Sequence, residues 1–269
     1  MDSIAFIGGG NMASALIGGL VERSEGHAPG IVVVDPDPGQ RERLAARFGV
    51  RTLGAADASL AGAGLVVWAV KPQYFKAAAA PCASHVAAAL HLSVMAGIRS
   101  EAIARALDNE RVVRAMPNTP ALIGRGIAGL YARPEVGADE RARVEALLAP
   151  TGEVLWVDAE VQLDAVTALS GSGPAYVFYV AEAMADAATA MGLSAEQGRR
   201  LALATCAGAA SLAQGSSEPL GRLREQVTSK GGTTAAALAT LDAHGVRAAF
   251  GAALEAARRR AAELGDEFG

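Results

Sequence analysis

The sequence predicts an α/β chain in which a doubly wound, mostly parallel domain is followed by an all-helical domain. Short β-branched runs alternate with helical stretches up to about Val157, most of these runs are almost continuously apolar, and the β signal stops after that point. Continuous apolar strands are typical of a parallel sheet buried on both faces. The two domains are therefore expected at 1–158 and 159–269.

The first domain contains five predicted strands: Ser3–Ile7, Ile31–Val34, Leu65–Val70, His91–Met95 and Arg111–Met116. Helical stretches between them include Asn11–Arg23 and Gly39–Phe48. Segment 112–156 is expected to add two strands around a helix over Ala138–Leu148. Strands that alternate with helices in this way form βαβ units.

The second domain contains six predicted helices, separated by breaks rich in Gly, Pro and Ser. They are Val161–Leu169, Ala175–Met191, Ala195–Gln214, Pro219–Gln226, Thr233–His244 and Val246–Leu264. Ser194 precedes Glu196 and Gln197, a pattern typical of a helix N-cap.

Composition excludes several functional classes. The net charge of −4 gives no basic footprint for nucleic acid, and no apolar run is long enough to span a membrane. No export signal is recognised at the N-terminus, so we expect a cytoplasmic protein. Two cysteines and four histidines show no metal or triad spacing, which predicts that no metal is bound. The alanine-rich second half favours close helix packing and a homo-oligomer.

The first predicted strand continues into GGGNMA, which fits the pattern G-x-G-x-x-A. Gly8 permits a tight turn, Gly10 lets backbone N–H groups approach a pyrophosphate, and Ala13 lets the helix pack on the sheet. Asn11 and Met12 open that helix and are expected to contribute to the same site. The pattern predicts a Rossmann-type dinucleotide site, the alternative being a merely structural glycine turn.

Asp35 ends the second predicted strand, about twenty residues after the glycines. A carboxylate there accepts the ribose hydroxyls of NAD and repels the 2′-phosphate of NADP. Arg41 and Arg43 follow within two helical turns and are candidates to hold such a phosphate, or they are solvated surface charges. NADH is slightly favoured, but the cofactor remains NADPH or NADH.

Val70, Lys71 and Pro72 follow the third of these strands, and Ala96 follows the fourth. Ligands of doubly wound sheets bind at the carboxyl ends of the strands, so all four are expected beside the cofactor. Ala96 is small enough to leave room for the nicotinamide. Lys71 is expected to face the cofactor or assist catalysis, and the alternative is that it caps a helix or lies in solvent.

Three further loops are candidates for a substrate site. Arg114–Pro120 is locked by two prolines, whereas Ser170–Pro174 and Thr228–Thr234 are glycine-rich and polar and each precedes a helix. Backbone N–H groups and hydroxyls at a helix start suit an anion such as a carboxylate. Rigid connection and ordinary helix capping are the alternatives.

Four blocks, in this order after GGGNMA, resemble the signature of pyrroline-5-carboxylate reductases. The blocks are Ala69–Pro72, Met116–Pro120, Ser170–Tyr176 and Gly231–Thr234. The resemblance covers essentially the whole chain, and SGSGPAY and GGTT are more specific than the glycine pattern. It implies reduction of Δ1-pyrroline-5-carboxylate to L-proline, the last step of proline biosynthesis. It also implies a helical domain that interleaves with a second subunit, often in larger rings of dimers.

The resemblance assigns substrate roles to the GGTT loop and to one acid. Backbone amides of the loop bind the substrate carboxylate, and the last threonine reaches the ring nitrogen. By position these roles fall on Ser229, Gly231, Gly232, Thr233 and Thr234. Glu160 matches an acidic residue that lies near the ligand in relatives.

The chain departs from the family pattern at two places. Lys230 stands where many relatives have proline, and it is positioned to add a cation beside the carboxylate. A polar residue that often contacts the adenosine is represented only by Ala55 or Ala56.

The expected chemistry asks little of side chains, because a protonated cyclic imine already accepts hydride at its C5 carbon. The protein orients the partners, and Thr234 is the candidate catalytic residue, as a contact to the imine nitrogen rather than as a general acid. One rival is a hydroxy-acid dehydrogenase, which needs a lysine or histidine acid–base, and Lys230 is the only lysine of the helical half. A silent NAD(P)-binding interaction protein is the other.

Overall fold

The computed structural model describes residues 3–24 and 30–268. Its contacts divide the chain into two compact units, Met1–Ser172 with Ala257–Gly269, and Gly173–Ala256. The first unit continues beyond the predicted boundary at Asp158, because the segment after it packs on the sheet. The assignment of 1–158 to the cofactor and 159–269 to substrate and dimerisation concerns function and stays a prediction.

The first unit is built on one eight-stranded sheet. Its strands are β1 Ser3–Ile7, β2 Ile31–Val34, β3 Arg51–Leu53, β4 Ala63–Trp68, β5 Leu90–Ser93, β6 Val112–Met116, β7 Gly126–Ala132 and β8 Gly152–Trp156. The spatial order is β3-β2-β1-β4-β5-β6-β7-β8, and only the β6–β7 pair is antiparallel. The first six strands have the order of a doubly wound dinucleotide-binding sheet, whose switch point lies between β1 and β4. The predicted fold class is confirmed.

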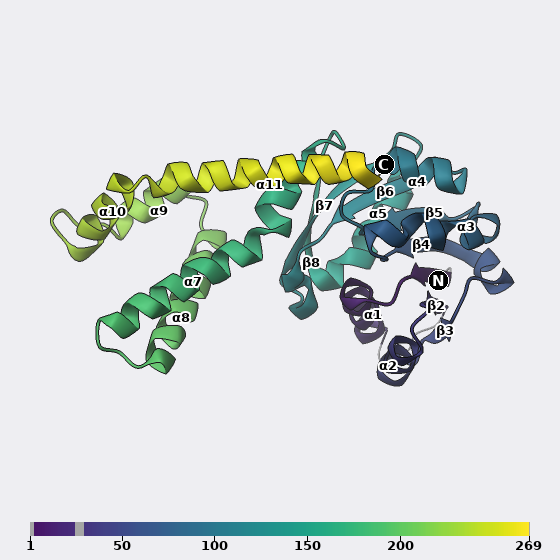
Figure 1. Ribbon diagram of the computed structural model, residues 1–269, viewed down its shortest axis with the longest axis horizontal. Helices are drawn as coiled ribbons and strands as arrows, with labels where there is room; N and C mark the ends of the chain where they lie inside the picture. The colour runs from purple at the N-terminus through teal and green to yellow at the C-terminus, as the bar shows by residue number, and fades with distance from the viewer. Residues whose placement is uncertain (1–2, 25–29, 269) are drawn as a thin grey trace. The chain divides into compact units, whose positions relative to one another are not determined.

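Helices cover both faces of this sheet (Figure 1). One face packs against α1 Asn11–Arg23, α2 Pro38–Phe48 and α5 Ala138–Leu148, and the other against α3 Phe75–Val86 and α4 Ser100–Leu107. Phe6 and Ile7 are both buried, yet they belong to opposite layers, because successive strand residues point to opposite faces. The predicted double-sided burial explains the continuous apolar runs.

Two helical pieces complete the first unit. Helix α6 Gln162–Val166 passes into a π-helix over Thr167–Gly171, where an α-helix to Leu169 is predicted. A Cβ on Gly129 of β7 would lie 2.7 Å from a methyl group of Val166, so glycine allows α6 to approach the sheet. The last part of α11 Val246–Phe268 also belongs to this unit.

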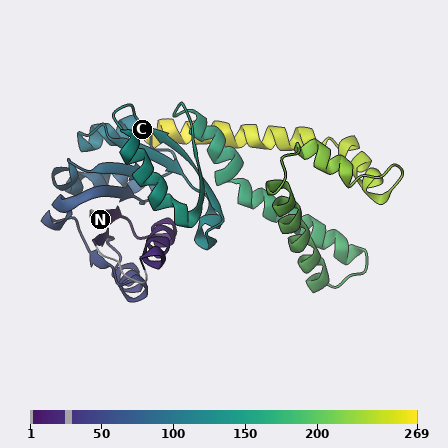
Figure 2. The same ribbon diagram turned by 180° about the vertical axis from the view of Figure 1, so that it is seen from behind.

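The second unit is all-helical, as predicted. It contains α7 Gly173–Ala190, α8 Ala195–Gln214, α9 Leu220–Gln226, α10 Thr233–Ala243 and the first part of α11. Helices α7 and α8 run side by side in both views (Figure 2). A Cβ on Gly198 would lie 2.8 Å from the carbonyl oxygen of Ala185, which shows how closely the two backbones approach. Ser194 caps α8 with Gln197 in a reciprocal capping box, as its spacing predicts.

Several large apolar side chains of the second unit are exposed in the single chain, among them Phe178 (65%), Tyr179 (73%), Leu212 (76%) and Met191 (78%). Within 3–24 and 30–268, no helix combines the length and the apolar character that a membrane span requires.

Candidate functional site

The glycine-rich turn joins β1 to α1 at the carboxyl edge of the sheet. Gly8 has a φ of +96°, and a Cβ on it would lie 2.6 Å from the carbonyl oxygen of Ala69, so the close approach to the end of β4 requires glycine. Gly10 is the N-cap of α1, and nothing lies within 4 Å of a Cβ built on it. Ala13 lies on the fully buried face of α1. The turn therefore leaves open space before the N–H groups of α1, as pyrophosphate binding requires.

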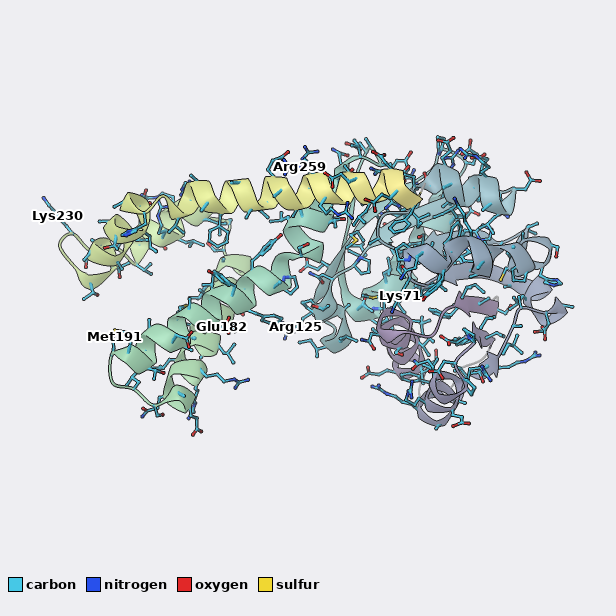
Figure 3. The ribbon with its side chains drawn as sticks, in the orientation of Figure 1. Lys71, Arg125, Glu182, Met191, Lys230 and Arg259 are labelled. Atoms are coloured by element: carbon cyan, nitrogen blue, oxygen red, sulfur yellow. The ribbon has the colours of Figure 1, made fainter. Side chains whose placement is uncertain are left out.

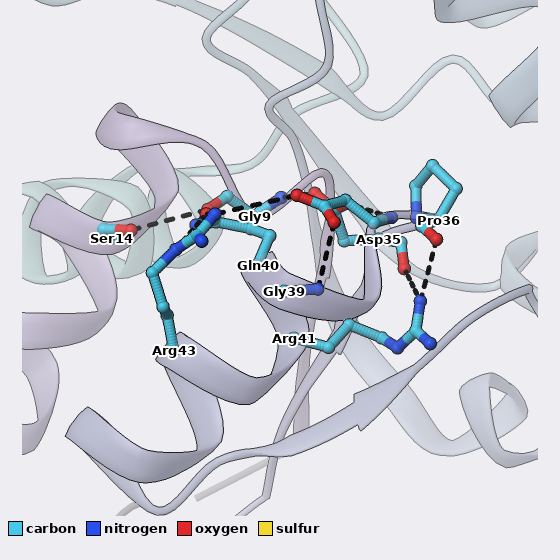
Figure 4. Close-up of polar contacts among 9 residues, drawn as sticks. Gly9, Ser14, Asp35, Pro36, Gly39, Gln40, Arg41 and Arg43 are labelled. Carbon is cyan, nitrogen blue, oxygen red and sulfur yellow. Dashed lines mark hydrogen bonds and ion pairs between the residues drawn. The ribbon is translucent and has the colours of Figure 1, made fainter.

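The carboxylate of Asp35 is fixed against this turn (Figure 4). Its Oδ2 accepts a hydrogen bond from the backbone N–H of Gly9 at 2.8 Å, and its Oδ1 accepts one from the N–H of Asp37 at 2.9 Å. The side-chain amide of Gln40 donates to the carbonyl oxygen of Gly9. Both backbone polar groups of Gly9 are thus bound by residues that follow β2.

Gly9 and Gln40 are site residues that the sequence analysis missed. A Cβ on Gly9 would lie 3.2 Å from Oδ2 of Asp35 and 2.6 Å from Cδ1 of Leu44. The available signal was the glycine at position 9, because the motif G-x-G-x-x-A allows any residue there and this chain still has glycine. Gln40 stands in the first turn of α2 without any such mark.

A cavity of about 850 Å³ opens beside the turn. Its walls are the glycine turn, the end of β2, the segment after β3, the end of β4 and one face of α3. Five predicted cofactor residues line it: Gly8, Gly10, Asp35, Val70 and Lys71. Its size and its place at the topological switch point fit a nucleotide.

Four other predicted cofactor residues do not line this cavity: Asn11, Met12, Pro72 and Ala96. Asn11 is exposed at the start of α1, whereas Met12 packs against the core. Pro72 begins a 3₁₀ helix over Pro72–Tyr74 that Lys71 precedes as N-cap residue, without a capping bond from its side chain. Ala96 follows β5 and is half-buried.

The side chains on the rest of the cavity wall are mainly apolar, and many of them are small. Ala55 and Ala56 line it, the two positions at which the resemblance implies a polar residue. Tyr74 and Cys82 of the α3 side also line it. Burial raises the pKa of the Cys82 thiol to about 11, so this side chain is neutral near pH 7.

The Met116–Pro120 block meets the first residues of the Ser170–Tyr176 block, Ser170–Ser172, within the first unit. Asn118 donates from Nδ2 to Oγ of Ser170 at 3.1 Å and accepts from the N–H of Ile127 at 3.0 Å. A Cβ on Gly171 would lie 2.5 Å from Cε of Met116, so the end of this side chain packs directly against the π-helix. Two segments about fifty residues apart in sequence are therefore joined at the carboxyl edge of the sheet.

Glu160 is held by three donors from two other segments. The N–H and the hydroxyl of Ser100 each donate to its carboxylate at 2.6 Å, and Nη1 of Arg114 donates at 2.7 Å. Burial raises the pKa of Glu160, but these hydrogen bonds outweigh it, so the net pKa lies below the ordinary value. The carboxylate thus stands at the N-terminus of α4, where a negative charge is favoured.

A second ion pair lies next to this one. Arg99 donates from Nη1 and Nη2 to the two oxygens of Asp164, both at 3.0 Å, and Asp164 is buried. The hydrogen bonds with Asp164 raise the pKa of Arg99. A Cβ on Gly265 of α11 would lie 2.5 Å from Nε of Arg99. None of these partners was identified from the sequence, although Arg114 in a strand buried on both faces signals a hidden acidic partner.

The predicted substrate residues Ser229 and Gly231–Thr234 lie together in the second unit, in the loop after α9 and in the start of α10. Gly231 has a φ of +71°, and the N–H of Gly232 donates to the carbonyl oxygen of Ser229 at 3.1 Å. Thr233 and Thr234 form the first turn of α10, whose N–H groups have no partner within the helix. The loop therefore offers the amides and hydroxyls that a carboxylate needs.

The Lys230 side chain projects outward from this loop (Figure 3). It is exposed, and so are Ser229 and Thr233, whereas Thr234 is half-buried. Glu160 belongs to the first unit and the loop to the second, so the joint substrate site that the resemblance implies stays a prediction.

No group of three potential metal ligands occurs among residues 3–24 and 30–268. His91 is fully buried and accepts a hydrogen bond from the indole N–H of Trp68 at 3.2 Å. His244 is exposed and lies 2.8 Å from the carbonyl oxygen of Thr240. His85 is half-buried in the last turn of α3, and His27 lies outside the described residues.

Comparison with known proteins gives two family matches. Residues 160–264 match the pyrroline-5-carboxylate reductase dimerisation family, and residues 3–97 match the family described as NADP oxidoreductase coenzyme F420-dependent. A pyrroline-5-carboxylate reductase of Pseudomonas aeruginosa is 44% identical over 270 residues, which cover 99% of this chain and 98% of that protein. The chain belongs to the pyrroline-5-carboxylate reductase family.

Solved structures of the family have the same fold. The reductase of Coxiella burnetii is 35% identical, with a TM-score of 0.90 and 98% coverage of both chains. The Plasmodium falciparum enzyme, with NADP bound, is 25% identical with a TM-score of 0.85 over 98% of both chains. The resemblance inferred from the four sequence blocks is confirmed.

Proposed function

We propose that this protein reduces Δ1-pyrroline-5-carboxylate to L-proline with NADPH or NADH. The observation that carries the proposal is the cavity at the glycine turn, with Asp35 fixed on its wall, in a chain that also carries the amide-rich GGTT loop. Membership of the family supplies the reaction. Proline biosynthesis is accordingly the proposed role.

The cofactor fits the observed residues. Space before the N-cap of α1 suits the pyrophosphate, and Asp35 suits the adenosine ribose. Around this core we assign further cofactor contacts to Asn11, Met12, Val70, Lys71, Pro72 and Ala96. When bound, the reduced nicotinamide supplies the hydride that reduces the imine carbon.

The loop between α9 and α10 binds the substrate carboxylate in this proposal. Backbone amides of Gly231 and Thr233 and the hydroxyl of Ser229 contact the anion, and the dipole of α10 adds to their effect. The N–H of Gly232 joins them by exchanging its bond to the carbonyl oxygen of Ser229 for the ligand. The hydroxyl of Thr234 contacts the ring nitrogen and orients the imine. An ordinary threonine hydroxyl is too weakly acidic to be the proton source, so orientation is its contribution.

Glu160 is also assigned to the substrate site by the family resemblance. Its three hydrogen bonds to Ser100 and Arg114 leave it fixed, so any contribution to the ligand comes from an oriented, negatively charged carboxylate.

A homodimer or a larger homo-oligomer in the cytoplasm is the proposed form of the enzyme. The dimerisation match over 160–264 supports the oligomer, and so do the exposed apolar side chains of Phe178, Tyr179, Met191 and Leu212. An isolated chain would leave these side chains in water.

The test is an assay of the purified protein with Δ1-pyrroline-5-carboxylate and either reduced cofactor, followed by loss of nicotinamide absorbance. Substrate-dependent oxidation that yields proline is the expected result. Turnover of a 2-oxo acid in its place would favour the hydroxy-acid dehydrogenase, and cofactor binding without any turnover would favour the silent binding protein.

A further inference from the structure

The turn between β2 and α2 holds the charges at one end of the cavity. Asp35 and Asp37 both line the cavity, and the carboxylate of Asp35 is oriented by the N–H groups of Gly9 and Asp37 (Figure 4). Each carboxylate oxygen of Asp35 has a second acceptor position beyond the bond described here. The acid therefore keeps acceptor capacity for ribose hydroxyls while both of its bonds to the turn remain.

Arg41 is engaged with the backbone of the same turn. Its Nη1 donates to the carbonyl oxygens of Asp35 at 2.8 Å and of Pro36 at 2.9 Å. Its Cζ lies 3.5 Å from a Cβ built on Gly54, so the guanidinium covers the segment that follows β3. Arg41 does not line the cavity. Its two hydrogen bonds fix the backbone at Asp35 and Pro36.

Arg43 lies two residues further along α2 and is engaged with side chains. Its Nε and Nη2 donate to Oε1 of Gln40 at 3.1 Å and 2.6 Å, and its Nη2 lies 3.6 Å from Oδ2 of Asp37. Gln40 in turn donates to Gly9, so this arginine holds the amide that faces the glycine turn. Arg43, like Arg41, is absent from the cavity wall.

We propose that the protein selects NADH over NADPH, with Asp35 as the specificity-determining residue and Arg41 as its positioning residue. The inference rests on the proposed function and narrows its cofactor. A 2′-phosphate would meet the carboxylates of Asp35 and Asp37, while both nearby arginines are bound to protein acceptors. Repulsion between the phosphate and these carboxylates disfavours NADPH binding. The ribose hydroxyls of NADH instead donate charge-assisted hydrogen bonds to Asp35.

The experiment measures the dissociation constants of NADH and NADPH and kcat/KM for each cofactor, using the full-length protein. We expect NADH to be preferred by about tenfold or more, the effect of one or two hydrogen bonds to a charged group. Asp35→Ser should reduce this preference by about tenfold. Asp139→Ser, the same exchange at an exposed position in the first turn of α5, is the matched control and should leave the preference unchanged.

Arg41→Met distinguishes two roles of Arg41: a positioning residue that fixes the turn at Asp35, or a ligand of the 2′-phosphate of NADPH. If Arg41 is a positioning residue, the variant binds NADH more weakly and shows no selective loss of NADPH affinity. Its kcat is unchanged, because the reacting carbon is at the other end of the cofactor. Selective loss of NADPH would show that Arg41 turns to the phosphate, and would overturn the proposal. So would a wild-type preference for NADPH. If neither cofactor binds, the proposed function itself fails.

Discussion

His91 lies on β5 with no exposed surface, and its Nδ1 accepts a hydrogen bond from the indole N–H of Trp68. An indole nitrogen only donates, so the geometry assigns the ring proton to Nε2, which has no partner in the described structure. A second proton would have to enter at Nδ1, facing the Trp68 N–H. Burial, with a smaller contribution from the charge of Arg111, lowers the pKa of His91 from 6.5 to about 4.

This shift makes folding pH-dependent. The unfolded chain binds the proton at its ordinary pKa of 6.5 and the folded chain only near pH 4, so the unfolded state gains protons first as the pH falls. The stability contribution of neutral His91 is therefore complete above pH 6.5 and is lost between about pH 6.5 and 4. The full loss is about 3 kcal/mol, of which about 2 kcal/mol falls between about pH 7.5 and pH 5.

Urea unfolding at a series of pH values, at constant protein concentration, measures this loss. His91→Gln is the matched variant, because its amide oxygen can still accept from Trp68 and it does not titrate. The free energy of unfolding of the wild type should fall by about 2 kcal/mol more than that of the variant over this range. Parallel pH profiles for the two proteins, or a directly measured His91 pKa near 6.5, would refute the reasoning.

Three further results are expected. Thr234→Ala should reduce kcat/KM for the imine about tenfold or more while cofactor affinity stays constant; equal losses in both, or a similar loss in the exposed control Thr240→Ala, would contradict the role. Glu160→Gln should lower the free energy of unfolding by about 3 kcal/mol, because Arg114 stays buried without its charge partner; a raised KM for the imine at unchanged stability would point instead to direct substrate contact. Alkylation of Cys82 should be slow at neutral pH, because its thiol is neutral, and slower still with NADH bound in the cavity. Labelling with a thiol reagent followed by peptide mapping measures the rate. Rapid labelling of Cys82 would contradict its burial.

Most of the first unit could be predicted because its strands report their burial directly. The runs at Ser3–Ile7 and Ile31–Val34 have the predicted bounds, and the strand expected at Leu65–Val70 differs only by its ends. By contrast β3 was missed, since it has three residues, begins with the exposed Arg51 and carries no apolar run. Edge strands of this length leave no periodicity to detect.

The end of the last helix and the π-helix could not be predicted from hydrophobic periodicity. Leu264 was predicted as the end of the last helix, yet α11 continues to Phe268. Gly265 is not a stop signal here, since the missing side chain makes room for Arg99. In the same way, nothing in the local pattern marks the π-helix over Thr167–Gly171, which is in contact with Met116 and Asn118 from the end of β6 and the loop after it.

The cofactor site was predictable to the extent that a motif dictates backbone geometry. Gly8, Gly10 and Asp35 take the places that the pattern requires, because a close βα turn admits few alternatives. Partners of charged side chains were not predictable in this way. Arg41 was left open between a phosphate ligand and a surface charge, and the structure instead joins it to two backbone carbonyls.

Glu160 illustrates how a family resemblance and a contact set constrain one residue. Its carboxylate neutralises a buried arginine and caps α4 at the same time, and loss of either partner leaves a charge or an N–H group unpaired. A ligand that required Glu160 to swing away would have to compensate both losses. In the proposed substrate site, the arrangement that costs least keeps Glu160 in place, where it holds the start of α6 on the sheet, and leaves the substrate contacts to the GGTT loop. Stability and KM of Glu160→Gln, measured on the same preparation, separate these two roles.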